Sequence, residues 1–178
     1  VDDDLLRLMA SQPRLLPYID LPLQHAHPDL LRRMRRPTAD PRQLVARIRA
    51  MVPDVALRST FIVGYPGETE DEHAALLRFL EEARLDRVGV FAFSAEAGTP
   101  AAILPDQVPE TVNRRRLDEA MRLQQRISLA RNQQLVGRVL DVLVEGRGPL
   151  PTGTGRQREH VRRRKQTLVC GRSYRDAP

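Results

Sequence analysis

Short apolar runs alternate along the chain with longer stretches of helical spacing. The runs at 56–63 and 88–93 are apolar on both faces, as buried parallel strands are, and a shorter strand at 18–21 is expected to end at Pro22. Helical spacing predicts helices at 3–10, 28–35, 41–52, 70–80 and about 110–134. This order predicts an α/β fold with a parallel sheet and crossover helices, in either a complete or partial β/α barrel or a doubly wound sheet.

Two of the predicted helices carry clear start signals. Asp40 is a natural N-cap and is followed by Pro41 at the first helical position. Thr69 is expected to cap the next helix, and Glu72 three residues later completes a capping box. On the long helix, one face is expected to hold Leu117, Met121, Gln124, Ile127 and Leu135, with arginines covering the rest.

The pattern changes near Gly137, where residues 138–146 alternate like a strand and residues 167–170 predict another. We therefore predict two domains, at 1–135 and 136–178, the second of β type. Between its strands, residues 148–166 hold a basic stretch. Six basic residues and one acidic residue lie between Arg156 and Lys165, so most of the net charge of +6 comes from one segment.

Composition narrows the class of protein. The 178 residues are 41% hydrophobic and 29% charged, and no apolar run approaches the length of a membrane span, which predicts a cytoplasmic protein without a membrane partner. The single cysteine, Cys170, suits a reducing compartment and excludes a zinc or iron–sulfur site built from several cysteines of this chain. Because Val1 is not a start methionine and a helix is already under way there, we expect a fragment.

Candidate chemistry gathers where the predicted strands end, since ligands of parallel β/α sheets sit at the carboxyl ends of the strands. The stretch RSTFIVGYPGETEDE contains a tight turn whose glycines let backbone approach a ligand, although turn chemistry alone also explains every residue of it. His25 and His27 form a bare pair, too few for a metal site. The candidate ligand-binding residues are Gln24, His25, Arg58, Thr60, Glu68, Phe93 and Ser94.

Arg58 is the most specific of these candidates. It shares a strand face with Thr60, and an arginine inside an apolar barrel needs an anionic partner. That partner is either a ligand carboxylate or, as the structural alternative, Asp20 or Glu68. Dinucleotide, P-loop, serine-hydrolase and HExxH zinc motifs do not occur in the sequence.

Three landmarks in order resemble the methylthiotransferases of the radical S-adenosylmethionine superfamily. They are YIDLPLQHAHPDLLRRMRRP, LRSTFIVGYPGETEDE and the stretch from DRVGVFAFSAEAGTPAA to LPDQVPE. The closing GRSYRDAP is similar to the family's TRAM domain, a small β-barrel. The resemblance implies the C-terminal half of a radical-SAM partial (β/α)6 barrel, followed by an incomplete TRAM-type domain.

Within that family, the PLQH, MRR and RVGVF segments resemble the branch that methylthiolates the β-carbon of an aspartate in the twelfth small-subunit ribosomal protein. The resemblance implies S-adenosylmethionine and two 4Fe-4S clusters as cofactors, with that ribosomal protein as partner. It also implies that six of the candidate residues line the barrel mouth where S-adenosylmethionine meets the aspartate, namely Gln24, Arg58, Thr60, Glu68, Phe93 and Ser94.

The chain departs from the family because the cysteines that hold both clusters are absent, so no metal ligand is predicted and this chain alone is expected to be inactive. Two alternatives stay open. One is a tRNA methylthiotransferase of the same family, and the other is a cluster-free module that binds RNA through the TRAM-like domain and the basic stretch.

Overall fold

A computed structural model of the chain describes residues 1–147 and 169–176. The chain divides into two compact units, Val1–Gly137 and Arg138–Pro178. The basic stretch at 148–166 lies outside the described residues, so its predicted role is unchanged. None of the helices in the described part is long and apolar enough to cross a membrane.

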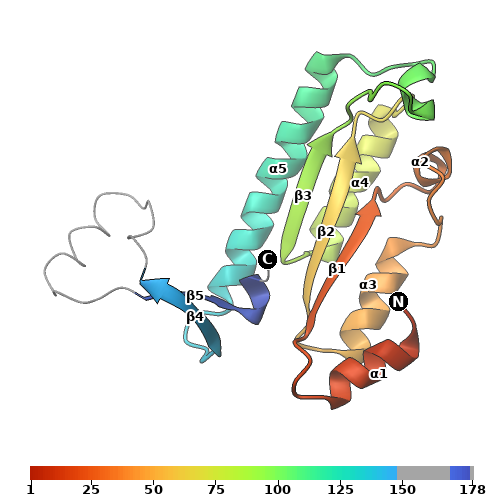
Figure 1. Cartoon of the computed structure of the whole chain (residues 1–178). Coiled ribbons are helices and arrows are strands. Elements are labelled where there is room, and N and C mark those ends of the chain that lie inside the picture. The colour runs from red at the N-terminus through yellow and green to blue at the C-terminus, as the bar shows by residue number, and fades with distance from the viewer. Residues whose placement is uncertain (148–168, 177–178) are drawn as a thin grey trace, which may run out of the picture. The chain divides into compact units, whose positions relative to one another are not determined.

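The first unit is built on a three-stranded parallel sheet in the order β1-β2-β3 (Figure 1). The strands are β1 (Tyr18–Gln24), β2 (Ala56–Val63) and β3 (Arg87–Ala92). The helices are α1 (Asp3–Ser11), α2 (Pro28–Arg33), α3 (Pro41–Met51), α4 (Glu70–Ala83) and α5 (Glu110–Gln133), with a short 3-10 helix at Pro100–Ile103. This arrangement confirms the predicted α/β class with a parallel sheet, whereas a barrel stays a prediction.

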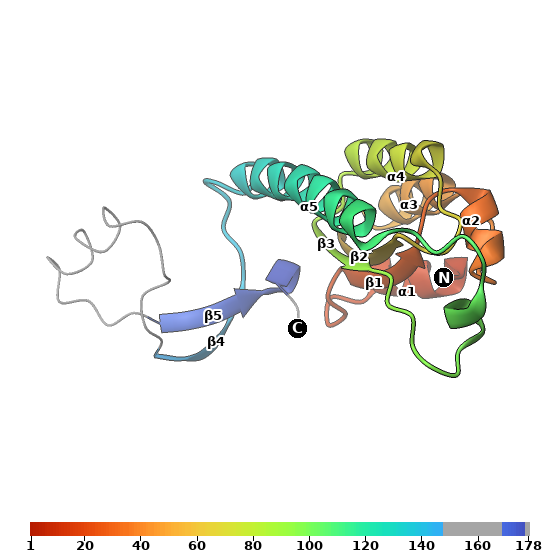
Figure 2. The same cartoon turned by 90° about the horizontal axis from the view of Figure 1, so that it is seen from above.

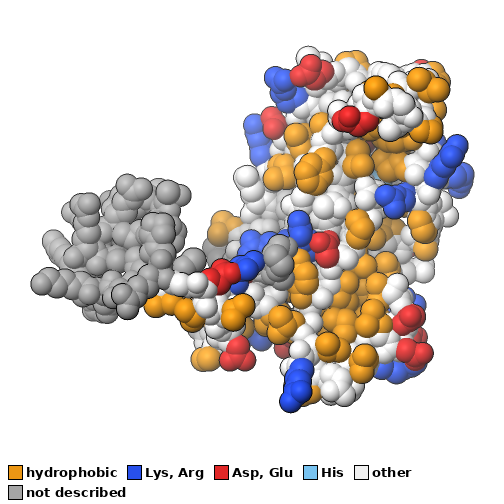
Figure 3. All heavy atoms as spheres, viewed as in Figure 1, with side chains coloured by type: hydrophobic (Ala, Val, Ile, Leu, Met, Phe, Trp, Pro, Cys, Tyr) orange, Lys and Arg blue, Asp and Glu red, His pale blue; other side chains and the backbone are white. Residues whose placement is uncertain are grey.

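Helices α3, α4 and α5 cover one face of the sheet, and none of the described helices of this unit lies on the opposite face of β2 and β3 (Figures 1 and 2). The covered face holds the core, where Leu57, Phe61 and Val63 of β2 are buried. Phe61 meets Phe79 of α4 edge to face, with ring centroids 5.9 Å apart. Hydrophobic side chains also gather on the uncovered face (Figure 3), and Phe91 of β3 remains 59% exposed there.

Local start signals form as the sequence predicts. The Asp40 side chain accepts a hydrogen bond from the N–H of Arg42, which caps α3. Thr69 and Glu72 make both hydrogen bonds of the capping box at the start of α4. These bonds fix the first turn of α4 directly after the turn that leaves β2.

The predicted end of the first strand at Pro22 is wrong, because β1 continues to Gln24. Pairing with β2 changes register between Leu21 and Gln24. Proline has no N–H to donate to a ladder, and such residues are accommodated at irregular or edge positions. The strand therefore carries Gln24 and the start of the next loop farther than the pattern predicts.

The second unit pairs two antiparallel strands, β4 (Val142–Arg147) and β5 (Val169–Ser173), followed by a 3-10 turn at Tyr174–Asp176. The predicted strands at 138–146 and 167–170 correspond to these, each shifted a few residues later. The pair agrees with a β-type unit, while the TRAM assignment stays a prediction.

Candidate functional site

The carboxyl ends of the strands form a mouth lined by the loops that follow them. Gln24 ends β1 in a left-handed conformation, with φ of 68°. Phe93, directly after β3, donates its N–H to the carbonyl of Val63 at the end of β2. Its ring lies 5.3 Å from that of Tyr65, edge to face. The structure therefore brings Gln24 and Phe93 to one edge of the sheet together with Tyr65, which the sequence analysis did not single out.

Two of the predicted residues lie deeper on the uncovered face. Arg58 Nη1 is 3.2 Å from Asp20 Oδ2, and both side chains are partly exposed. Within the protein, the anionic partner of Arg58 is thus Asp20 rather than Glu68. Arg58 precedes the end of β2 by five residues, roughly 16 Å along a strand. Thr60 lies on the same face but closer to the mouth, and a ligand role for either residue stays a prediction.

Ser94 is exposed and donates its hydroxyl to Glu96 Oε1 at 3.2 Å. His25 and Glu68, by contrast, have side chains with no exposed surface, and they approach each other inside the protein. Of the seven predicted residues, these two can influence a ligand only through their neighbours in this structure. Their predicted roles in binding stay untested.

Glu68 stands at the centre of a buried polar cluster beneath the mouth. Its Oε2 accepts hydrogen bonds from the N–H of Gly64 and from Arg116 Nη1, the second at 3.0 Å. Its Oε1 lies 3.3 Å from His25 Nε2 and 3.9 Å from His73 Nδ1. The turn after β2, the end of β1, α4 and α5 all contribute to this cluster.

Arg116 was missed because the long helix was expected to cover its outer side with arginines. Instead its side chain is 3% exposed, and the buried face of α5 includes Asn113 and Gln124 as well as apolar residues. The sequence offered one signal that Arg116 is buried. It lies one helical turn from polar Asn113 and directly before Leu117, a residue of the expected buried face. The prediction for the arginines of this helix is therefore wrong at Arg116.

Hydrogen bonds and burial shift the pKa values of two side chains around this cluster, Glu70 and His73. Hydrogen bonds from Arg115 and Arg116 lower the pKa of Glu70 to about 2. Burial lowers the pKa of His73, and a hydrogen bond with Glu119 only partly opposes that effect. Near neutral pH, the cluster thus combines ionised Glu70 with a neutral His73.

A second set of contacts ties α2 to the same turn. Arg33 Nη2 donates to the carbonyl of Gly67 at 3.2 Å and to Glu72 Oε2 at 2.6 Å. Burial raises the pKa of Glu72, but hydrogen bonds from Arg33 and from the N–H of Thr69 outweigh it and lower the pKa overall. His27 caps α2 by accepting from the N–H of Asp29.

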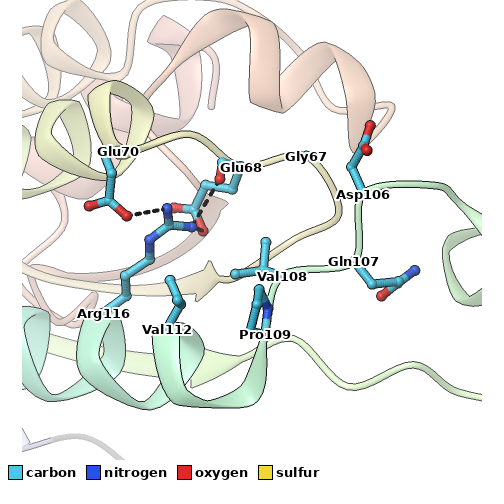
Figure 4. A pocket seen from close by; sticks show the side chains of 9 residues that line it. All are labelled: Gly67, Glu68, Glu70, Asp106, Gln107, Val108, Pro109, Val112 and Arg116. Atoms are coloured by element: carbon cyan, nitrogen blue, oxygen red, sulfur yellow. Dashed lines mark hydrogen bonds and ion pairs between the residues drawn. The ribbon is translucent and has the colours of Figure 1, made fainter.

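A pocket of about 440 Å³ opens beside the cluster, between the turn after β2 and the start of α5 (Figure 4). Glu70 and Arg116 meet at one side of it, and Val108, Pro109 and Val112 form an apolar side. The N–H of Gly67 donates to the carbonyl of Asp106 at 2.8 Å, which joins the turn to the loop before α5. All three loops at this end of the sheet are therefore connected.

The donor set can be tested against the cofactors that the resemblance implies. The described residues include no group of three His, Cys, Asp or Glu side chains placed to hold a metal ion, so they do not fit an iron–sulfur cluster. S-adenosylmethionine has a carboxylate, an ammonium group and an aromatic base. Arg58, Gln24 and the Tyr65–Phe93 pair offer matching groups on the uncovered face and at the mouth.

The chain is similar to known proteins at two levels, a superfamily and individual enzymes. The model of the radical SAM superfamily matches residues 1–80. A ribosomal protein uS12 methylthiotransferase RimO from Chloroflexus aurantiacus is 54% identical over the whole chain, and one from Roseiflexus castenholzii is 53% identical. The homologue from Thermus thermophilus is 50% identical over 98% of the chain. Along its whole length the chain is thus similar to methylthiotransferases, and residues 1–80 match the radical SAM superfamily.

The chain spans only part of the length of these relatives. It covers 37% of the Chloroflexus aurantiacus protein and 35% of the Roseiflexus castenholzii protein. The similarity therefore concerns about a third of the length of these relatives and does not by itself extend to the activity of the whole enzyme.

Proposed function

We propose that this chain supplies the C-terminal part of a radical-SAM partial barrel, and that its enzyme methylthiolates an aspartate of ribosomal protein uS12. The observation that carries this proposal is the identity of 50% or more, along nearly all of the chain, with three proteins named as uS12 methylthiotransferases. The parallel sheet, with its polar groups at the carboxyl ends of the strands, is the geometry such a role requires.

In this proposal S-adenosylmethionine lies across the uncovered face and the mouth. Arg58 binds its carboxylate, exchanging part of its ion pair with Asp20 for the ligand. Gln24 and Ser94 supply hydrogen bonds at the mouth, Thr60 contacts the ligand between them and Arg58, and Phe93 with Tyr65 offers an aromatic surface. His25 and Glu68 hold the loops beneath. The iron–sulfur clusters, two in the resemblance, would be held by residues outside this set.

The test requires an enzyme of full family length. We define the carrier enzyme as the Chloroflexus aurantiacus relative in which this chain replaces the matching 180 residues. Reconstituted anaerobically, the carrier enzyme is expected to add one methylthio group to ribosomal protein uS12, measured by mass spectrometry of the purified substrate. Modification of tRNA instead of uS12 would support the alternative branch, and absence of both activities would contradict the proposal.

Arg58→Ala in the carrier enzyme tests the proposed cofactor site. We expect methylthiolation to be abolished and binding of S-adenosylmethionine to weaken, because the guanidinium that binds the ligand carboxylate in this proposal is lost. Arg126→Ala is the matched control, since Arg126 is an exposed arginine of α5. Normal turnover in Arg58→Ala would remove Arg58 from the site and leave the proposed reaction standing.

The 178-residue chain alone is expected to be inactive, because its single cysteine, Cys170, cannot supply the several cysteine ligands of an iron–sulfur cluster. Anaerobic reconstitution that loads a stoichiometric cluster onto this chain would contradict that expectation.

A further inference from the structure

We infer that Arg116, a residue of the helix layer, is a positioning residue. It holds the loops that line the mouth in place through its contacts with Glu68. The inference rests on the proposed function, because it concerns how the same mouth is held for its ligand. Arg116 Nη1 donates to both the carbonyl and the Oε2 of Glu68 at 3.0 Å, and Nη2 donates to Glu70 Oε1 at 2.8 Å. One planar guanidinium thus binds both Glu68, just before the N-cap of α4, and Glu70, the first residue of α4.

Glu68 connects Arg116 to the backbone of the turn after β2. The Oε2 that receives Arg116 also receives the N–H of Gly64. Gly64 has φ of 75°, a conformation that side-chain-bearing residues rarely adopt. Asn113, one turn before Arg116 on α5, fills the space where a Cβ of Gly64 would lie. The conformation of the turn is therefore held from α5 by two neighbouring side chains.

Glu68 also reaches the end of β1. His25 Nδ1 accepts a hydrogen bond from the N–H of His27 at 3.1 Å, so a neutral His25 carries its proton on Nε2. That Nε2 lies 3.3 Å from Glu68 Oε1. Both atoms are fully buried, and neither makes a hydrogen bond among the described residues, so the two lie within ion-pair distance without hydrogen-bond geometry. His25 follows directly after Gln24, whose φ is 68°, so its close contact with Glu68 connects the end of β1 to the cluster.

This connectivity predicts what the loss of Arg116 does. Glu68 would be left as a buried carboxylate without its cation, and such a group is stabilised only by taking up a proton or admitting water. Either change weakens the contacts to Gly64 and His25. Displacements of about 1 Å at a site can cost about 100-fold in activity, so a small shift of these loops is enough to affect ligand binding.

The experiment compares Arg116→Met and Arg116→Lys in the carrier enzyme. Methionine replaces the unbranched apolar stem of arginine without its charge, whereas lysine keeps the charge but has no fork for Glu68 and Glu70 together. Arg114→Met is the matched control, because Arg114 lies on the same helix, is 73% exposed and pairs with Glu110 only among the described contacts.

Two measurements are made on each variant: the dissociation constant for S-adenosylmethionine by equilibrium dialysis, and amide hydrogen exchange over residues 64–68. In Arg116→Met we expect the dissociation constant to rise at least about tenfold and protection at Gly64 to fall. Arg116→Lys is expected to lie between Arg116→Met and the unsubstituted enzyme, and Arg114→Met to change nothing. A merely structural role would reduce the number of binding sites per protein and leave the dissociation constant of the remaining sites unchanged.

An unchanged dissociation constant together with unchanged exchange in Arg116→Met would overturn the inference and leave the proposed function intact. If the unsubstituted carrier enzyme binds no S-adenosylmethionine, the proposed function fails instead. The exchange measurement then decides alone whether Arg116 sets the turn: lost protection at Gly64 supports it, and full protection overturns it.

Discussion

Gly64→Ala is the change whose cost can be worked out most directly from the structure. With φ of 75°, alanine at this position occupies the left-handed region, which costs about 1–2 kcal/mol. An added Cβ would also lie 1.8 Å from Asn113 Oδ1 and 2.3 Å from its Cγ, distances that require the Asn113 side chain, α5 or the turn to move. Overpacking of this kind typically costs about 1–3 kcal/mol. We expect the free energy of unfolding to fall by about 2–5 kcal/mol.

The assay is urea unfolding of the 178-residue chain, followed by far-ultraviolet circular dichroism. Gly98→Ala is the matched control, because Gly98 has φ of 84° but no atom within 4 Å of an added Cβ, so it carries the backbone cost alone. The double variant Gly64→Ala with Asn113→Ala completes a mutant cycle. It should be more stable than the two single changes predict by addition, by about 1–3 kcal/mol, since the clash is gone.

Two results would refute this reasoning. If Gly64→Ala is no more destabilising than Gly98→Ala, the contact between the turn and Asn113 has no energetic weight. If the cycle shows additivity, the cost of Gly64→Ala comes from the backbone alone, and α5 does not hold the turn through Asn113.

Two further predictions concern the first turn of α4 and its buried face. Thr69→Ala is expected to lower the free energy of unfolding by about 1 kcal/mol, because the capping box is lost. Thr111→Ala is the control and should change little, since Thr111 is an exposed helix position without a capping bond. Equal effects of the two changes in urea unfolding would contradict the first expectation. Because the pKa of His73 is lowered on folding, the unfolded chain takes up its proton first as the pH falls below about 6.5, so stability should decrease from pH 7.5 to 5.5. His73→Gln should flatten this dependence, and an unchanged slope would exclude His73 as its source.

The local elements could be predicted because their causes are local. Apolar runs bounded by turns determine the strands at 56–63 and 87–92, and helix caps such as Asp40 and Thr69 act within one turn of the residues they cap. The strand through Pro22 was predicted too short, since pairing across an irregular register compensates for the missing N–H in a way that no local pattern reveals. Strand ends could be named as the place for ligands because parallel topology gathers them at one edge.

The sequence by itself determined which segments become strands and helices, which loops lie at the mouth, and which family the chain resembles. Only the tertiary structure decided how the polar residues there are used. Glu68 and His25 were predicted to face a ligand, yet they are buried against each other, and Arg116 lies beneath them although it is 48 residues from Glu68. Periodicity identifies the face of an element on which a residue lies. Which charges meet across elements depends on how the helices pack on the sheet, which no single segment encodes.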